Sequence, residues 1–169
     1  MPIVIGFCGA VLISPNESNK SLEQRKSEFH QKFEVLNKKN RIGNMRKELY
    51  QRGLFNKAAD VAVNAVKEAL VLQDSAHFSG INVDYIISKG VFYVQGDVDS
   101  LNAYGKLLRG RFERYVKLSG EQLIDITHLL SEEESVNFVA ALDKEAKEED
   151  LWLKKYNKLM DEWLNTFHK

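Results

Sequence analysis

Two aspartates, Asp97 and Asp99, stand two positions apart in the stretch YVQGDVDSLNAY, directly after a run of β-branched and aromatic residues. Carboxylates at positions i and i+2 beyond a strand can both reach a divalent cation where the backbone curves into a loop, and Mg²⁺ or Mn²⁺ prefers such oxygen ligands. The same residues suit a plainer role, because aspartate and serine cap helix N-termini and favour the helix dipole. The sequence therefore leaves open a metal site and a helix cap, and the cap is the simpler interpretation.

The segment GDVDS, from Gly96 to Ser100, resembles the GDxDS signature of thiamine pyrophosphokinases, and more loosely the strand-end aspartates of palm-type nucleotidyl cyclases. This resemblance implies a Mg²⁺-dependent nucleotide enzyme with Asp97 and Asp99 as metal ligands. It covers these five residues only, and the second acidic hairpin of the palm family, a GGDD-like sequence, is absent downstream.

The preceding segment, KGVFYVQG, partly resembles the RNP1 motif of RNA-recognition modules. Lys89, Gly90, Tyr93 and Val94 match the motif, whereas aromatic residues are missing at its first and last stacking positions. Because successive strand residues face opposite ways, Tyr93 stacks on a base only if it faces solvent. The resemblance implies binding of single-stranded RNA or DNA. With the nearby basic residues, the candidate set is Lys38, Lys39, Arg41, Arg46, Lys47, Lys89, Tyr93, Arg111 and Arg114.

The charges are balanced in number but not in position. The chain has 24 basic and 24 acidic residues, a formal net charge of zero. Basic residues gather between Lys38 and Lys57 and again between Lys106 and Lys117, while acids gather in SEEE (131–134) and DKEAKEED (143–150). Such segregation fits an anionic partner, or pairing within the molecule and a solvated face, which is the simpler explanation.

Other catalytic patterns are missing from the sequence. Cys8 lies in an apolar run, where a thiol stays protonated, and the four histidines lack metal-ligand spacing. Glycine does not directly precede Lys20, as a phosphate-binding loop requires, and no G-x-S-x-G elbow is present. We therefore expect no catalytic residue and no cofactor, which favours a non-enzymatic protein.

Length and composition predict one domain over residues 1–169. A single cysteine excludes an intramolecular disulfide, which favours a reducing cytoplasm. The N-terminal run PIVIGFCGAVLIS has no preceding basic residue and falls short of the ~20 residues that cross a bilayer. We expect it to form a buried strand, and we expect no membrane partner.

Hydrophobic periodicity predicts helices, a hairpin and a further strand after that first strand. Ser21 and Gln24 form a capping box that starts a helix near Leu22, and NRIGN interrupts it around Gly43. A second helix runs to about Tyr50, and a third spans 56–72. INVDYIIS and VFYVQ form a hairpin around Lys89-Gly90, a helix follows from about 100 to 110, and RFERYVKL is a strand. This order predicts an α+β fold with a ferredoxin-like antiparallel sheet and an enlarged helical insertion after the first strand.

A helical tail over 131–169 follows the α+β body over 1–130. Ser131 and Glu134 form a second capping box, and the tail is one amphipathic helix or two. Its aromatic stripe must be buried, either on the domain's own sheet or against another chain. The candidate protein-binding residues are Trp152, Tyr156, Leu159, Trp163 and Phe167.

The functional expectation is a non-enzymatic cytoplasmic regulator, inhibitor or assembly protein that acts by protein-protein binding. Its partner is another protein or a second copy of the chain. A single-stranded nucleic-acid-binding protein is the first alternative, and a Mg²⁺-dependent nucleotide enzyme that uses Asp97 and Asp99 is the second.

Overall fold

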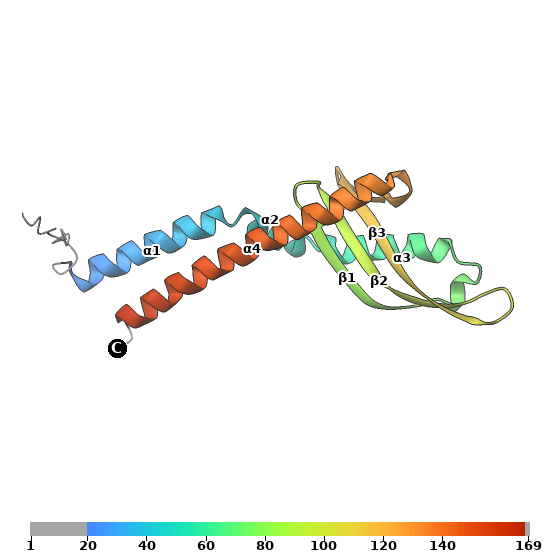
Figure 1. Cartoon of the computed structure of the whole chain (residues 1–169), viewed down its shortest axis with the longest axis horizontal. Coiled ribbons are helices and arrows are strands. Elements are labelled where there is room, and N and C mark those ends of the chain that lie inside the picture. The colour runs from blue at the N-terminus through green and yellow to red at the C-terminus, as the bar shows by residue number, and fades with distance from the viewer. Residues whose placement is uncertain (1–19, 168–169) are drawn as a thin grey trace, which may run out of the picture.

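The computed structural model describes residues 20–167. The described part of the chain begins with three consecutive helices (Figure 1). Helix α1 (Leu22–Lys39) starts at the predicted capping box of Ser21 and Gln24, which is confirmed. The break after it lies at Asn40, whose side chain accepts a hydrogen bond from the Gly43 N–H and so starts α2. Helix α2 spans Arg41–Gln51 and α3 spans Leu54–Glu68.

A four-stranded antiparallel sheet follows the helices in simple sequential order. After a short 3-10 turn (Gln73–Ser75), the strands are β1 (His77–Ile86), β2 (Val91–Leu101), β3 (Leu107–Ser119) and β4 (Gln122–Asp125). The predicted hairpin between β1 and β2 is confirmed, and Gly90 adopts φ 67° in its turn, a backbone angle that glycine tolerates without strain.

The helix predicted over about 100–110 is wrong. Strand β2 continues to Leu101 and pairs with β3 without interruption, from Val91 opposite Lys117 to Leu101 opposite Leu107. Asn102 makes the turn between these strands by accepting hydrogen bonds from the backbone N–H groups of Tyr104 and Lys106. The described sheet is therefore a meander with no helix between β2 and β3. The predicted first strand lies outside the described residues, so a ferredoxin-like arrangement is not confirmed.

The sheet lies between two helical layers (Figure 1). Helix α3 covers one face, where Ala58 and Ala62 have no exposed surface and allow close contact with Phe92 and Val116. The first half of α4 (Glu132–Phe167) covers the other face through Phe138 and its neighbours. Successive residues of β2 alternate between these two cores, as strand geometry requires.

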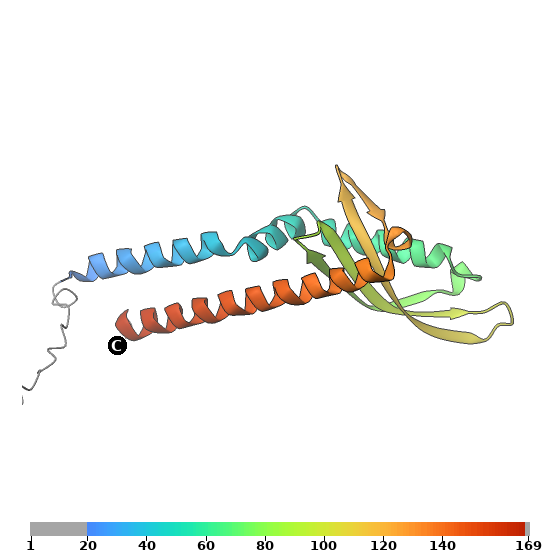
Figure 2. The ribbon, with the colours of Figure 1, turned by 45° about the horizontal axis from the view of Figure 1, so that its top comes forward.

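Helix α4 is one continuous helix, which settles the choice left open by the sequence. Its predicted capping box is confirmed: the Ser131 N–H donates to Glu134 Oε2 at 2.8 Å, and the Glu134 N–H donates to Ser131 Oγ. The hydrogen bonds that the Ser131 N–H and hydroxyl donate to the Glu134 carboxyl lower its pKa. Beyond the sheet, α4 runs side by side with α1 away from the body of the molecule (Figures 1 and 2). We call this helical pair, α1 with residues 150–167 of α4, the stalk.

Within residues 20–167, no helix is both long enough and apolar enough to span a membrane.

Candidate functional site: the groove of the stalk

The aromatic stripe of α4 contacts α1 and does not lie on the sheet. Trp152 Nε1 donates a hydrogen bond to the carbonyl oxygen of Leu36 at 3.0 Å, and the rings of Tyr156 and Phe33 meet edge-on at 5.6 Å. Phe167 makes a similar edge contact with α1. The stripe consists of the predicted protein-binding residues Trp152, Tyr156, Leu159, Trp163 and Phe167.

Burial along the stalk is incomplete. Helix α1 contains no buried residue, and every one of the five stripe residues on α4 is only partly buried. Val35, beside this seam, is 52% exposed. Two helices can cover only one side of each other, so apolar side chains at the edges of their contact remain open to solvent.

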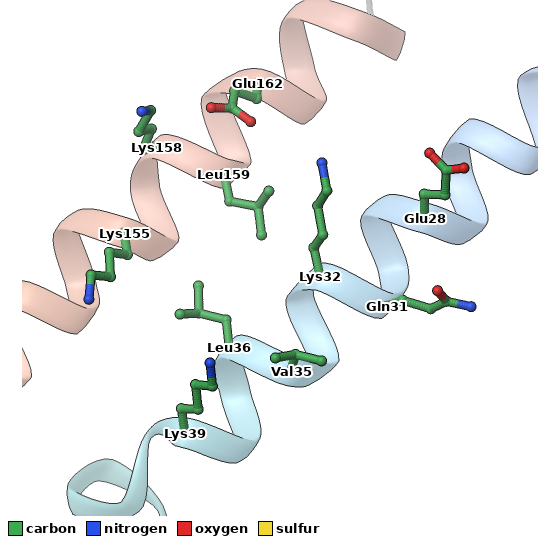
Figure 3. A pocket seen from close by; sticks show the side chains of 10 residues that line it. All are labelled: Glu28, Gln31, Lys32, Val35, Leu36, Lys39, Lys155, Lys158, Leu159 and Glu162. Carbon is green, nitrogen blue, oxygen red and sulfur yellow. The ribbon is translucent and has the colours of Figure 1, made fainter. Parts of the chain in front are cut away.

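A groove of about 610 Å³ runs between the two helices of the stalk (Figure 3). Leu36 of α1 and Leu159 of α4 point toward each other across it, and Val35 lies beside them. The remaining lining residues are polar or charged: Glu28, Gln31, Lys32, Lys39, Lys155, Lys158 and Glu162. The site is thus an apolar strip with charged borders.

The charges on the groove are unevenly distributed along it. Helix α1 runs toward the body and α4 runs away from it, so Lys39 and Lys155 lie at the body end. Glu28 and Glu162 lie toward the far end, where Glu28 pairs with Lys20 at 2.7 Å. With four lysines and two glutamates, the lining has a net positive charge.

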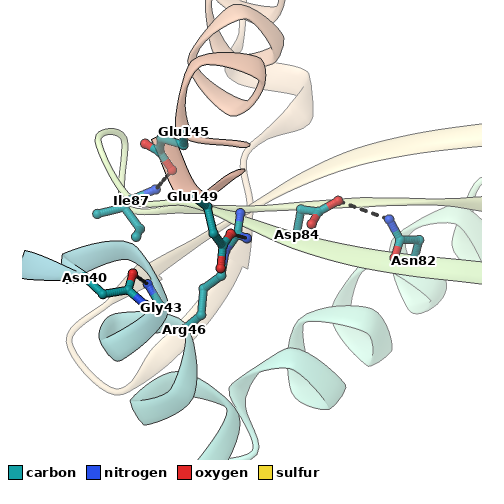
Figure 4. A network of polar contacts seen from close by, with 8 residues as sticks. All are labelled: Asn40, Gly43, Arg46, Asn82, Asp84, Ile87, Glu145 and Glu149. Atoms are coloured by element: carbon teal, nitrogen blue, oxygen red, sulfur yellow. Dashed lines mark hydrogen bonds and ion pairs between the residues drawn. The ribbon is translucent and has the colours of Figure 1, made fainter. Parts of the chain in front are cut away.

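Polar contacts hold α4 to the body just before the stalk begins (Figure 4). Arg46 of α2 forms an ion pair with Glu149 of α4. The carboxylate of Glu145, one turn earlier, is buried and accepts hydrogen bonds from the backbone N–H groups of Ile87 and Ser88, at 2.9 and 2.8 Å. These contacts fix α4 to the β1-β2 turn and to α2, and so set the direction of the stalk.

Sequence reasoning missed Glu145, because it lies in the acidic run DKEAKEED and resembles its exposed neighbours. The spacing of Glu145 from the apolar residues before it on the helix could have revealed its burial. Phe138, Ala141 and Leu142 pack on the sheet, and Glu145 continues their stripe at the same spacing. A carboxylate in an apolar stripe indicates a buried acceptor.

The two aspartates of GDVDS lie inside strand β2, neither in a loop nor at a helix N-terminus. Both earlier interpretations of their local structure are therefore wrong. Across the strand pair, Asp97 is opposite Arg111 and Asp99 is opposite Arg109, whose Nε lies 3.2 Å from Asp99 Oδ1. The described residues contain no group of three or more His, Cys, Asp or Glu side chains that could hold a metal ion. At Asp99 the Arg109 guanidinium already supplies positive charge to the carboxylate.

Tyr93 does not face solvent. It is 8% exposed, packs against Tyr115 with 5.3 Å between ring centroids, and belongs to the core that α4 covers. Burial, and then the negative charge of Glu113, raise the pKa of Tyr93 to about 12. A base cannot stack on this ring while α4 is in place.

The basic candidates are not gathered into one surface. Arg46 is bound to Glu149, Arg114 lies 3.8 Å from Asp125, and Arg111 donates to Gln95. Lys89 lies over the ring of Phe138. The exposed members at the α1-α2 junction are Lys38, Lys39, Arg41 and Lys47. Of the whole set, only Lys39 lines the groove.

Comparison with protein-family models, with curated proteins and with solved structures found no match.

Proposed function

We propose that the protein is a cytoplasmic, non-enzymatic regulator, inhibitor or assembly protein that binds another protein through its stalk. One observation carries this proposal: α1, a helix of 18 residues, has no buried side chain although it borders a groove with an apolar floor. A partner that covers this face would bury what the pair of helices cannot bury for itself.

The gain available from such a contact is substantial. Complete burial of an exposed valine or leucine side chain contributes about 1.5–3 kcal/mol. Val35 is more than half exposed, and Leu36 and Leu159 are partly exposed. A few such residues, surrounded by charges that exclude wrong partners, form the usual composition of a binding site for a protein segment.

The two alternative functions have less support. Asp97 and Asp99 lie opposite arginines, which disfavours a divalent cation. Tyr93 is covered by α4, which removes the stacking surface needed for single-stranded nucleic acid. The exposed lysines near the α1-α2 junction remain as a nucleic-acid alternative, so the test must separate protein from nucleic acid.

Site-specific photo-crosslinking in the native cells tests the proposal. A photoreactive residue replaces Val35, and a control carries the same residue in place of Lys57, an exposed position of α3. We expect a nuclease-resistant adduct with a defined protein from position 35 and none from position 57. No adduct at position 35, or an adduct that nuclease removes, would contradict the proposal.

A further inference from the structure

We infer that the partner of the stalk is an acidic amphipathic helix that lies along the groove between α1 and α4. This inference rests on the proposed function and specifies the partner's chemistry. Its apolar residues would cover Val35, Leu36 and Leu159, and its acidic residues would meet the lysines at the borders.

The shape of the groove favours a helical occupant. The groove follows two helices that run side by side, and its lining extends along α1 from Glu28 to Lys39, with Val35, Leu36 and Leu159 as its apolar residues (Figure 3). A helix presents apolar residues in a narrow stripe at spacings of three and four residues, which fits a strip of this form. An extended strand would instead need unpaired backbone groups at a sheet edge, and two α-helices offer none.

Charge identifies the chemistry of the occupant. Lys39, Lys155 and Lys158 form no ion pair with any residue of the described chain, and Lys32 lies 4.9 Å from the centre of the Phe29 ring. These lysines border the strip on both helices. Opposite charges across an interface speed association and exclude like-charged partners. A helix with glutamate or aspartate on both sides of its apolar stripe would be complementary to this surface in charge and in apolar contact.

A second copy of the chain fits the same surface less well. In a two-fold symmetric contact, identical patches face each other. The groove has four lysines and two glutamates, so each copy would present a net positive face to a net positive face. An acidic partner is attracted by the four lysines and meets repulsion only from the two glutamates, Glu28 and Glu162, at the far end. The glutamates at the far end predict, in addition, a basic residue at that end of the partner helix.

Two synthetic peptides as long as α1, which has 18 residues, test the inference with the full-length protein. They share one helical leucine stripe, and the flanking positions are glutamate in one peptide and lysine in the other. Fluorescence anisotropy measures their dissociation constants. We expect the acidic peptide to bind at least about tenfold more tightly, with a difference that shrinks as salt is added.

A variant with reversed charge in the groove, compared with a control of equal net charge, tests the role of the groove lysines. The double substitution Lys155→Glu and Lys158→Glu should weaken binding of the acidic peptide at least about tenfold and strengthen binding of the basic one. The control, Lys26→Glu with Lys57→Glu, makes the same change of net charge outside the groove lining and should alter affinity less than about twofold. Far-UV circular dichroism of each variant checks that the stalk helices remain formed.

Three outcomes would overturn the inference: equal affinity of the two peptides, no binding of either, or a dimer of the full chain that Val35→Asp dissociates in sedimentation equilibrium. The crosslinking experiment separates this failure from failure of the proposed function. If position 35 still forms a protein adduct while the acidic peptide shows no preference, the stalk binds a protein of another chemistry. If position 35 forms no adduct, the proposed function itself fails.

Discussion

At the scale of single residues, Glu145 is a charged side chain that is buried in the fold. Its carboxylate lies inside the contact between α4 and the sheet and accepts two backbone N–H groups from the β1-β2 turn. A buried N–H without an acceptor is costly, so the turn and the helix depend on this one carboxylate. The same charge, after burial, raises the pKa of the nearby Tyr85 hydroxyl.

Replacing Glu145 should therefore destabilise the protein. Glu145→Gln keeps one acceptor oxygen and turns an amide N–H₂ toward the second donor, which should lower the free energy of unfolding by about 1.5–3 kcal/mol. Glu145→Ala should cost more, because it leaves both donors unpaired. Urea denaturation measures the effect, and Glu148→Gln, an exposed neighbour, should stay within about 0.5 kcal/mol of the unchanged protein. Equal effects at 145 and 148 would contradict this role.

Ionisation of Tyr93 should lower the stability of the folded protein at high pH. Its pKa is raised from 10.0 to about 12, so the folded state holds a proton that the unfolded state releases between these values. The contribution of this pKa shift to the free energy of unfolding is complete below about pH 10 and declines as pH rises toward 12. Urea denaturation at about pH 9 and about pH 11 should show a smaller decline for Tyr93→Phe than for the unchanged protein. Tyr115, whose pKa is also raised, should leave a residual decline.

At the scale of elements, two glycines within paired strands differ in the space around them. A Cβ at Gly96 of β2 would lie 2.9 Å from the Phe112 ring and 3.2 Å from the Ser79 carbonyl oxygen. A Cβ at Gly110 of β3 would meet nothing closer than 3.9 Å. The Phe112 ring therefore packs directly on the backbone of β2, which only glycine allows.

Alanine at these two positions should give opposite results. Gly96→Ala should lower the free energy of unfolding by about 1–3 kcal/mol, because the ring and the carbonyl leave no room for the methyl group. Gly110→Ala should be neutral or stabilise the protein by up to about 1 kcal/mol, since alanine reduces the freedom of the unfolded chain. Thermal or urea denaturation of the two variants makes the comparison. Similar losses at both positions would show that the Phe112 contact is not the cause.

At the scale of the whole molecule, α4 is the connecting element. Its 36 residues give a length of about 54 Å, of which one half lies on the sheet and the other half in the stalk. The ion pair of Arg46 with Glu149 and the hydrogen bond from Trp152 to Leu36 hold α1 and α2 beside it. The stalk therefore projects from the body in a fixed direction (Figure 2).

This projection predicts an elongated particle in solution. A compact chain of 169 residues has a radius of gyration of roughly 16 Å. Small-angle X-ray scattering, extrapolated to low concentration to remove any dimer, should give a value well above this, with a distance distribution that tails to long separations. A value near 16 Å would mean that the stalk folds back on the body.

The local signals of the sequence determined the starts of α1 and α4 and the first hairpin turn. Ser21 with Gln24 and Ser131 with Glu134 satisfy orphan backbone groups within one helical turn, so their effect needs no other part of the chain. The Lys89-Gly90 turn is equally local, because glycine alone supplies the positive φ it requires. The α+β class and the helical tail follow from the same short-range periodicity.

Only the tertiary structure decided the rest. The 101–108 segment has apolar residues at helical spacing, yet it forms the turn between β2 and β3, with Leu101 paired to Leu107, because the long ladder on either side outweighs a weak local preference. The depth of Glu145 and Tyr93 depends on where α4 crosses the sheet, and the partner of the aromatic stripe is α1, more than a hundred residues earlier. Such contacts join distant segments, and no pattern within one segment contains the geometry that brings them together.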